Sequence, residues 1–324
     1  MLFNNPQSSR TNPFHGFYNS DAFRNGLANK DRLPLFPFLV DVELTNECNM
    51  RCLFCVQQTM ERPRGYMQWP VFKKIVDECA EYHSPIRLIR IGEPFLHKDI
   101  IEYAKYVKSK GLPLHITCNG LAISEDDMKA IISLELDSLI FSFQGATKEQ
   151  YAIMRNTNQY EKLKNNVIKL VELRGNKAKP FIHISSTMTD ESSEQIKEFT
   201  AYWGSIVDSV GVGQTNLSIL SLEQINSLKV AGQLKEAKKH ETIRKEYRPC
   251  TEVYQKLSID WDGKVSCCCS DYENFLTVGD INETSLQEIW NHSPELKIFR
   301  ELLDKKKHKA LTLCSKCYHT YDEF

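Results

Sequence analysis

Hydrophobic and polar residues follow two kinds of pattern along the first two thirds of the chain. Short apolar runs rich in β-branched residues predict buried strands, and longer segments with an apolar residue every three or four positions predict amphipathic helices. The predicted strands cover residues 38–44, 87–91, 114–117, 138–143, 181–185 and 209–213. The predicted helices cover residues 71–82, 99–108, 125–134, 161–174 and 194–203.

This regular alternation of strand and helix indicates the fold class. Repeated strand–helix units produce a parallel sheet with right-handed crossovers. About six such units predict an α/β fold, a partial (β/α)6 TIM-like barrel, in which functional residues gather at the carboxyl ends of the strands. We expect the barrel at residues 35–214, after an irregular N-terminal arm at residues 1–34.

The pattern changes after Gln214. Residues 215–249 are rich in charged positions and predict a connector with one helix. Residues 250–324 hold six of the eleven cysteines, which predicts a second, smaller domain. Within it we expect a hairpin that includes residues 256–259 and Val265, with Asp262-Gly263 at its turn, and a helix that begins at residue 286.

Composition narrows the classes of function. A net charge of −1 and an isoelectric point near 6.8 provide no basic surface for nucleic acid or an anionic membrane, which favours small, roughly neutral ligands. The sequence has no signal-peptide pattern and no run of about 18 apolar residues, so we expect a cytoplasmic protein that does not bind a membrane. Cysteines persist as thiols in the cytoplasm, so clustered cysteines indicate a metal centre or catalysis.

Three cysteines lie close together after the first predicted strand. Cys48, Cys52 and Cys55 have the spacing C-x3-C-x2-C. A [4Fe–4S] cluster is normally held by four thiolates, so three would leave one iron open to a small molecule. Structural zinc is the alternative, but it favours C-x2-C pairs with further ligands at matching spacing, and no histidine occurs between Cys55 and His83.

These cysteines, with Phe54 before the last one, resemble the CxxxCxΦC motif of the radical S-adenosylmethionine (SAM) superfamily, and the predicted barrel agrees with that family. The resemblance covers residues 38 to 320. It implies that the open iron binds SAM through its amino and carboxylate groups. It also implies that one electron from the cluster cleaves SAM to methionine and a 5′-deoxyadenosyl radical. Phe54 would contact the adenine, although packing in the core explains this side chain equally well.

Further segments at predicted strand ends resemble SAM contacts of the family. Gly92-Glu93-Pro94 resembles the Gly-Gly-Glu-Pro segment that holds the SAM amino group, with Ile91 in place of the first glycine. Ser142-Phe-Gln-Gly145, which includes Gln144, resembles the ribose and carboxylate contact region, and Arg155 resembles a basic residue that pairs with the SAM carboxylate. Ordinary turns and a surface arginine are the alternatives. Thr117-Cys-Asn-Gly120 is similarly family-like.

Polar residues on predicted strands are candidates for substrate binding. Arg90 lies between two isoleucines, so a strand register could direct it into the barrel. His183, Ser185 and Thr187 share one strand face, which suits a hydroxyl-rich substrate.

The C-terminal cysteines resemble the SPASM/twitch extensions of the same superfamily. The matching pattern is Cys250, then Gly263-x4-Cys268, then Cys314-x2-Cys317. The resemblance implies that Cys250, Cys268, Cys314 and Cys317 hold one auxiliary [4Fe–4S] cluster with all four corners occupied. A zinc ribbon is the alternative, and either Cys267 or Cys269 could replace Cys268 as a ligand.

This layout predicts the reaction. Removal of hydrogen from an alcohol carbon leaves a radical that must lose one proton and one electron to become a ketone, and an auxiliary cluster can accept that electron. The resemblance to a single-cluster aminocyclitol dehydrogenase implies an oxidoreductase that acts on a small sugar-like or cyclitol alcohol, with flavodoxin or ferredoxin as electron donor. The alternatives are a peptide-modifying enzyme, a carbohydrate epimerase with a spare cysteine such as Cys118 as hydrogen donor, and a non-catalytic iron–sulfur electron-transfer protein.

Overall fold

The computed structural model describes residues 1–20, 23, 33–189, 191–215 and 250–317. Within these ranges ten strands form one sheet in the order β1-β7-β6-β5-β4-β3-β2-β8-β9-β10. Six parallel strands form its centre: β2 (Leu39–Val42), β3 (Ile86–Leu88), β4 (Leu114–Cys118), β5 (Ser138–Gln144), β6 (Phe181–Met188) and β7 (Ser209–Gln214). This arrangement confirms the predicted α/β fold and partial (β/α)6 barrel. The predicted connector lies outside the described residues except for Thr215.

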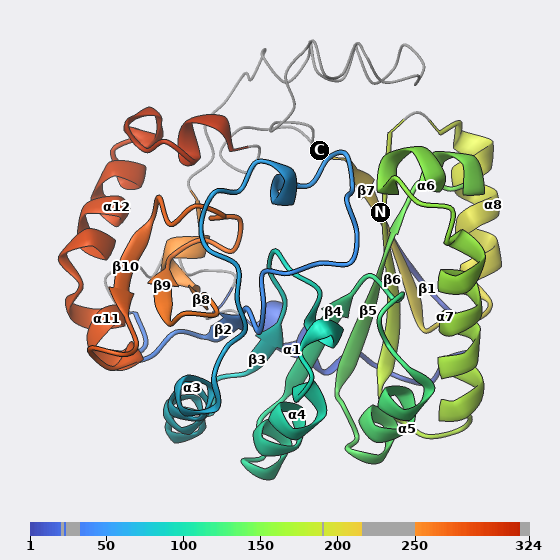
Figure 1. Cartoon of the computed structure of the whole chain (residues 1–324), viewed down its shortest axis with the longest axis horizontal. Coiled ribbons are helices and arrows are strands. Elements are labelled where there is room, and N and C mark those ends of the chain that lie inside the picture. The colour runs from blue at the N-terminus through green and yellow to red at the C-terminus, as the bar shows by residue number, and fades with distance from the viewer. Residues whose placement is uncertain (21–22, 24–32, 190, 216–249, 318–324) are drawn as a thin grey trace.

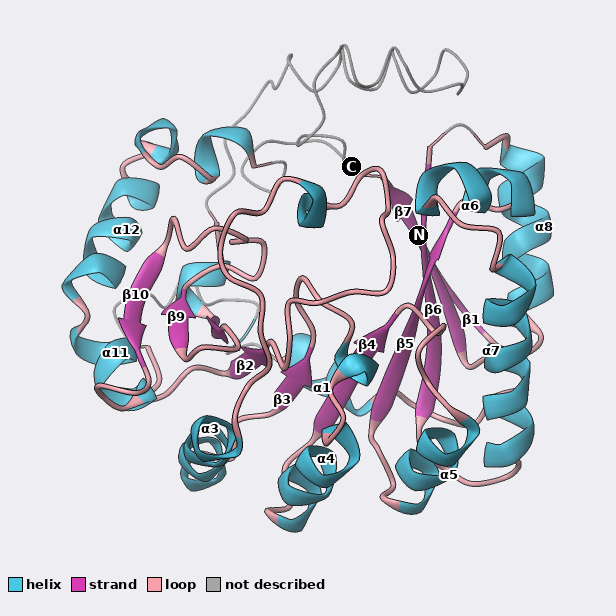
Figure 2. Cartoon of the chain, viewed as in Figure 1, coloured by secondary structure: helices cyan, strands magenta, loops and turns pink. Residues whose placement is uncertain are grey.

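Helices line the outer side of the sheet (Figures 1 and 2). The five predicted helices are present, with bounds within two residues of the prediction: α3 (Trp69–Glu81), α4 (Ile100–Ser109), α5 (Glu125–Ser133), α7 (Tyr160–Arg174) and α8 (Ser193–Gly204). The structure adds α6 (Lys148–Arg155) between β5 and α7. Short 3-10 helices connect other elements: η2 (Val56–Gln58), η3 (Pro94–Leu96), η4 (Glu252–Tyr254), η5 (His308–Ala310) and η6 (Cys314–Lys316).

The two faces of the central strands differ in polarity. On the outer face Phe143 of β5 packs against Trp203 of α8, with ring centroids 5.1 Å apart. On the inner face of β6 every second residue, at positions 183, 185 and 187, remains partly exposed. Alternate residues of a strand point to opposite faces, so this burial pattern follows from the pleat. The inner face is therefore the polar one, as predicted.

The C-terminal segment continues the same sheet. β8 (Lys256–Ile259) pairs parallel with β2, and β9 (Lys264–Ser266) and β10 (Thr277–Asp280) follow in antiparallel pairing. The predicted hairpin is confirmed as β8–β9, with Gly263 at φ +97° in its turn. The parallel pairing of β8 with β2 was not predicted. The helices α11 (Leu286–His292) and α12 (Pro294–Asp304) follow.

The N-terminal arm is not irregular throughout, which corrects the prediction. β1 (Leu2–Asn4) pairs antiparallel with β7, and α1 (Pro13–Tyr18) begins where the Asn12 side chain accepts a hydrogen bond from Phe14 N. Phe14 packs edge-on against His115 at the start of β4, and the Tyr18 hydroxyl accepts a hydrogen bond from Arg87 of β3 at 2.8 Å. α1 therefore covers the inner face of the sheet near the amino-terminal ends of β3 and β4. No helix among the described residues is long and apolar enough to cross a bilayer.

Candidate active site

The loop after β2 carries the first three cysteines. Burial, together with the nearby Glu93 carboxylate and the thiols of Cys52 and Cys55, raises the pKa of the Cys48 thiol to about 11. Two donors are directed at these sulfurs: Asn119 Nδ2 lies 3.7 Å from Cys48 Sγ, and Arg155 Nη1 lies 3.5 Å from Cys52 Sγ. Three neighbouring thiols with hydrogen-bond donors to the sulfurs fit an iron–sulfur cluster, whose thiolate charge such donors stabilise.

Gly92 brings the end of β3 against this loop. A Cβ atom at Gly92 would lie 2.0 Å from the Thr45 carbonyl oxygen, so only glycine allows the two backbones to approach. Glu93 N then donates a hydrogen bond to the Glu47 carbonyl at 2.8 Å. The substitution of Ile91 for the family's first glycine does not prevent this contact.

Glu93 joins the ends of two strands. Its side chain is buried, and its two oxygens accept hydrogen bonds from Phe95 N at 3.1 Å and from Asn119 N at 2.6 Å. Burial raises the pKa of Glu93 to about 7. Asn119, after β4, also donates to the Asn49 side chain at 2.7 Å. The signal for Asn119 was the family-like segment in which it lies.

Arg155 at the end of α6 is a buried cation beside the cysteine loop. Its Nη2 donates to the carbonyl groups of Ser142 at 2.8 Å and Phe143 at 3.1 Å, and the guanidinium lies 5.5 Å from the centroid of the Phe54 ring. The buried Nε has no hydrogen-bond partner among the described residues. The alternative of a surface arginine is therefore wrong. An unpartnered donor on a buried guanidinium suits a carboxylate ligand.

Ser142 and Gln144 lie on the inner face of β5 but differ in their availability. Ser142 is partly exposed and gives its carbonyl to Arg155. Gln144 is fully buried: its Oε1 accepts from Thr187 Oγ1 at 2.6 Å and its Nε2 donates to Thr215 Oγ1 at 2.8 Å. The amide of Gln144 thus ties strand ends together.

The predicted polar stripe on β6 faces the same inner side. Strand register aligns His183 with Ile140 and Ser209, and Ser185 with Ser142. His183 Nδ1 lies 2.6 Å from Ser209 Oγ, and burial lowers the pKa of His183 to about 4, so its imidazole is neutral at pH 7. Ser185 and Thr187, which lie nearer the carboxyl end of β6, carry hydroxyl groups that can exchange hydrogen bonds with an alcohol, whereas His183 lies near the amino-terminal end of the strand.

The prediction that Arg90 faces a substrate is wrong. β3 ends at Leu88, and Arg90 adopts φ +137°, which breaks the strand alternation on which the prediction depended. Its side chain is fully buried and forms an ion pair with Asp260 at 2.9 Å. The anionic partner that a buried arginine requires is thus part of the protein itself.

Several of the C-terminal cysteines lie close enough to affect one another's pKa values. Burial, together with the nearby Glu252, Cys317 and Cys314, raises the pKa of Cys250 to about 12. Burial also raises the pKa of Cys267 and of Cys268, and nearby Cys250 contributes to both shifts.

Cys269 lies beside Glu252. Its Sγ donates to Glu252 Oε2 at 3.4 Å, and Lys256, Asp41 and Arg87 are among the charges that act on it. Cys269 and Glu252 also raise the pKa of Cys268, so Cys268 lies near both Cys269 and Cys250, whereas Cys267 lies near Cys250 and Cys314.

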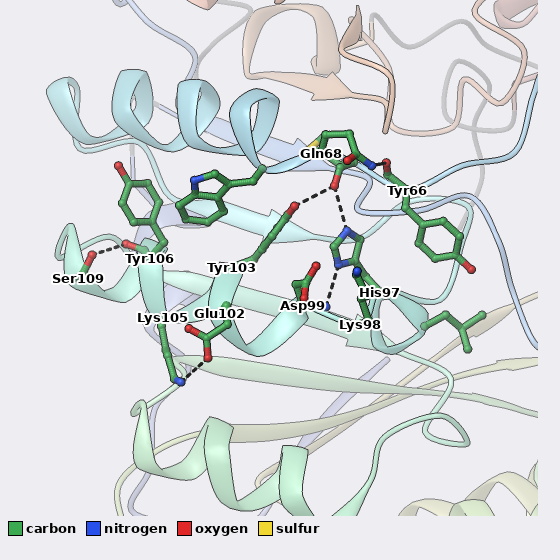
Figure 3. A pocket seen from close by; sticks show the side chains of 13 residues that line it. Tyr66, Gln68, His97, Lys98, Asp99, Glu102, Tyr103, Lys105, Tyr106 and Ser109 are labelled. Carbon is green, nitrogen blue, oxygen red and sulfur yellow. Dashed lines mark hydrogen bonds and ion pairs between the residues drawn. The ribbon is translucent and has the colours of Figure 1, made fainter.

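An open cavity of about 870 Å³ lies between the loop before α3 and helix α4 (Figure 3). Its lining includes Tyr66, Trp69 and Tyr106 and none of the predicted ligands or SAM contacts. In Figure 3 His97 and Tyr103 converge on one backbone oxygen, the Met67 carbonyl, at 3.0 and 2.9 Å. The cavity is thus separate from the candidate site, and the groups at its base hold the loop.

Comparison with known proteins identifies the family. The Radical SAM superfamily model matches residues 42–200, and the model of the SPASM iron–sulfur cluster-binding domain matches residues 250–318. The tungsten-containing aldehyde ferredoxin oxidoreductase cofactor-modifying protein of Pyrococcus furiosus is 27% identical over 310 residues, which cover 85% of this chain and 86% of that protein.

Two solved structures share the fold at 16% sequence identity. BtrN in complex with AdoMet and 2-DOIA gives a TM-score of 0.54 over 87% of this chain and 92% of its own. SuiB of Streptococcus suis, bound to the precursor peptide SuiA, gives 0.65 over 92% of this chain and 74% of its own. This chain therefore belongs to the radical SAM superfamily, as an enzyme that uses SAM and a [4Fe–4S] cluster and has a SPASM-type C-terminal domain for auxiliary iron–sulfur chemistry.

Proposed function

We propose that this enzyme dehydrogenates an alcohol carbon of a small hydroxyl-rich molecule, such as a cyclitol or a sugar. The observation that carries the proposal is the polar inner face of β5 and β6, where the hydroxyl residues Ser142, Ser185 and Thr187 are partly exposed toward the carboxyl ends of the strands. Hydroxyl groups on rigid strands can exchange hydrogen bonds with a polyol without charged partners.

The cysteines divide between two clusters in this proposal. Cys48, Cys52 and Cys55 would hold the cluster that binds SAM, and Cys250, Cys268, Cys314 and Cys317 would hold one auxiliary [4Fe–4S] cluster. When bound, the first cluster would supply one electron for the cleavage of SAM, which provides the 5′-deoxyadenosyl radical, and the auxiliary cluster would supply an acceptor for one electron.

The proposed SAM contacts are Phe54, Gly92, Glu93, Ser142, Gln144 and Arg155. Arg155 has the strongest support, because its buried Nε lacks a partner among the described residues. Both polar ends of the Gln144 side chain are already hydrogen-bonded to threonines. We therefore assign Gln144 the task of fixing the strand ends around the ligand.

The proton of the proposed reaction would leave to solvent. Loss of a hydrogen atom from the carbinol carbon leaves a radical, and departure of the hydroxyl proton to water and of one electron to the auxiliary cluster would complete the ketone. His183 is not assigned this role, because it aligns with Ser209, the first residue of β7, at the end of the sheet that α1 covers and opposite the proposed SAM contacts.

The test uses anaerobically reconstituted protein with dithionite and SAM. A panel of cyclitols, aminocyclitols and sugars would carry deuterium on the carbinol carbons. We expect deuterium in 5′-deoxyadenosine, a product lighter by two hydrogens, and roughly eight iron atoms per chain. Formation of 5′-deoxyadenosine without change in any polyol would contradict the proposed substrate class, and iron near four would contradict the auxiliary cluster. Reduced flavodoxin or ferredoxin should replace dithionite.

A second candidate is modification of a cofactor or peptide. It is favoured by the 27% identity with the Pyrococcus furiosus cofactor-modifying protein, which extends over most of both chains. The same assay with peptides encoded beside the gene distinguishes the two functions, because the mass change would then appear on the peptide. Inversion of a carbinol centre with uptake of solvent deuterium would instead indicate an epimerase.

A further inference from the structure

Four charged side chains meet at the carboxyl ends of β3, β2 and β8. Arg62 Nη2 lies 2.6 Å from Glu43 Oε2, and Arg62 Nη1 lies 3.5 Å from Asp260 Oδ1. Arg90 Nη2 lies 2.9 Å from Asp260 Oδ1, and Arg90 Nε lies 3.9 Å from Glu43 Oε2. Each of the four side chains is at most 6% exposed, so two guanidinium groups and two carboxyl groups are buried together.

Both arginines also hold the loop that follows the three consecutive cysteines. Arg90 Nη2 donates to the Asp271 carbonyl at 2.5 Å, and Arg62 Nε donates to the Tyr272 carbonyl at 2.8 Å. The Glu273 carboxylate accepts hydrogen bonds from the backbone N of Glu61 at 2.5 Å and of Arg62 at 3.1 Å. Three successive residues of the C-terminal segment are thus attached to the barrel.

The attachment points flank the candidate SAM site. Arg62 lies seven positions after Cys55, and Arg90 lies two positions before Gly92. The C-terminal loop begins two positions after Cys269, beside the proposed auxiliary ligand Cys268. The contacts of Arg62 and Arg90 therefore connect the segment that follows the first three cysteines to the segment that follows the C-terminal cysteines.

Stability alone does not account for this arrangement. A buried ion cluster is typically no more stabilising than apolar side chains of the same volume, because each charge loses its hydration. Arg90 in addition adopts φ +137°, a backbone conformation that is strained for a residue with a Cβ. Strain of this kind persists where the surroundings fix it, and it is found at functional sites.

We infer that Arg62 and Arg90 are positioning residues that fix the loop of the auxiliary ligand relative to the SAM site, and thereby set the reduction potential of the auxiliary cluster. The inference rests on the ligand assignment of the proposed function. Hydrogen bonds, net charge and solvent exposure around a cluster control its potential, and all three depend on where this loop lies.

The test replaces Cys48, Cys52 and Cys55 together by alanine, so that the auxiliary cluster alone contributes to the EPR spectrum. Arg62→Lys and Arg90→Lys are then introduced separately, because lysine keeps the charge but lacks the second donor direction of the guanidinium. We expect at least a tenfold change in the reduction equilibrium, about 59 mV for one electron, with altered g values. With the three cysteines restored, formation of 5′-deoxyadenosine should stay within about twofold.

Lys74→Met is the matched control. Lys74 also joins the barrel to the C-terminal segment, through the carbonyl groups of Ile281 and Thr284, but away from the cysteine loop. It should leave the potential unchanged. If an arginine variant does not fold, Glu273→Ala provides a second test. It removes the hydrogen bonds from the backbone N of Glu61 and Arg62 without leaving a buried charge, and it should shift the potential in the same way.

The outcomes separate this inference from the function on which it rests. A parent protein with no auxiliary cluster would overturn the ligand assignment and the inference together. A parent with the cluster, whose potential and g values are the same in Arg62→Lys, Arg90→Lys and Glu273→Ala, would overturn the inference and leave the proposed function intact.

Discussion

At the scale of single residues, Arg155 provides the most direct test of the candidate SAM site. Its Nη atoms are occupied by two carbonyl groups and by Cys52, and its buried Nε is left without a partner among the described residues. Hydrogen bonds to charged groups contribute about 1.5–3 kcal/mol. We therefore expect Arg155→Met to raise the Kd for SAM roughly 10- to 100-fold in equilibrium binding to the reconstituted protein.

The control for this variant is Arg51→Met. Arg51 is an exposed arginine of the same loop and donates to the Cys48 carbonyl at 3.1 Å. Its replacement should change SAM affinity less than about twofold. Unchanged SAM affinity in Arg155→Met, with full iron content, would remove Arg155 from the proposed contacts.

His115 predicts how the stability of the fold depends on pH. Its nitrogens lie 3.1 Å from Ser138 Oγ and 2.8 Å from Thr117 Oγ1, and burial lowers its pKa to about 3. The folded state thus keeps His115 neutral, while the unfolded state takes up a proton below its ordinary pKa of about 6.5. This term is absent above pH 6.5, and it costs stability increasingly as the pH falls toward 3.

At pH 5.5 the cost should be about 1.4 kcal/mol. Calorimetric midpoints of the reconstituted protein at pH 7.5 and 5.5 measure it, with His115→Gln as the comparison. We expect the midpoint of the native protein to fall a few degrees further than that of the variant. Equal decreases would show that His115 does not carry this part of the acid sensitivity.

At this scale the sequence identified which residues gather near the cysteines but not how each side chain is used. Glu93 contacts the cysteine loop through Glu47, and Arg155 lies beside Cys52. The Gln144 amide is hydrogen-bonded to Thr187 of β6 and to Thr215, the residue after β7. Arg90 is paired with Asp260, which is 170 positions away. Partners so distant in sequence cannot be read from a local pattern, because the pattern records only period and residue type.

Gly92 controls the packing of two elements, the end of β3 and the loop after β2. Gly92→Ala would place a methyl group 2.0 Å from a backbone oxygen, which cannot move without displacing the cysteine loop. We expect loss of iron from the SAM site and at least about a tenfold fall in 5′-deoxyadenosine formation. Gly204→Ala, at the end of α8 where no atom lies within 4 Å, is the matched control and should retain both.

Helix α1 should stabilise the amino-terminal side of the barrel. Phe14 is 2% exposed, whereas Phe3 on the edge strand β1 is 36% exposed. Truncation of a buried phenylalanine costs about 3–5 kcal/mol, and truncation of an exposed one costs little. Phe14→Ala should therefore lower the unfolding midpoint by several degrees more than Phe3→Ala. Equal midpoints would show that α1 does not support the barrel.

The elements themselves were predicted unevenly, for physical reasons. Regular strand–helix units were found because each amphipathic pattern repeats with one period. Helix α6 was missed, although Thr147 and Gln150 have the Thr-x-x-Gln spacing of a capped helix start, and the Thr147 side chain does accept from Gln150 N. Helix α1 was missed because six residues are too few to show a period.

At the scale of the whole molecule, one sheet connects the two cysteine-bearing regions. β2 lies between β3 and β8, so the loop with Cys48, Cys52 and Cys55 leaves a strand that pairs directly with the first strand of the SPASM segment. The sequence predicted two units from the change in cysteine content. Pairing between β2 and β8 was unpredictable because neither strand has a register signal that specifies so distant a partner.

This continuity makes the division of labour between the two regions testable. In the double variant Cys250→Ala/Cys314→Ala we expect iron to fall from roughly eight to roughly four atoms per chain, because each cubane holds four. The SAM site lies on different elements, so 5′-deoxyadenosine should still form. Under the proposed dehydrogenation, the yield of ketone per 5′-deoxyadenosine should fall at least about tenfold, because the substrate radical would have lost its electron acceptor.

Cys79→Ala is the control, since Cys79 is a fully buried thiol of α3 outside both sets. It should keep roughly eight iron atoms and the native ratio of ketone to 5′-deoxyadenosine. If the double variant loses iron but keeps that ratio, the electron leaves the substrate radical by another route. The C-terminal cluster would then serve to hold the sheet edge and its loop in place, and the radical chemistry would belong to the barrel alone.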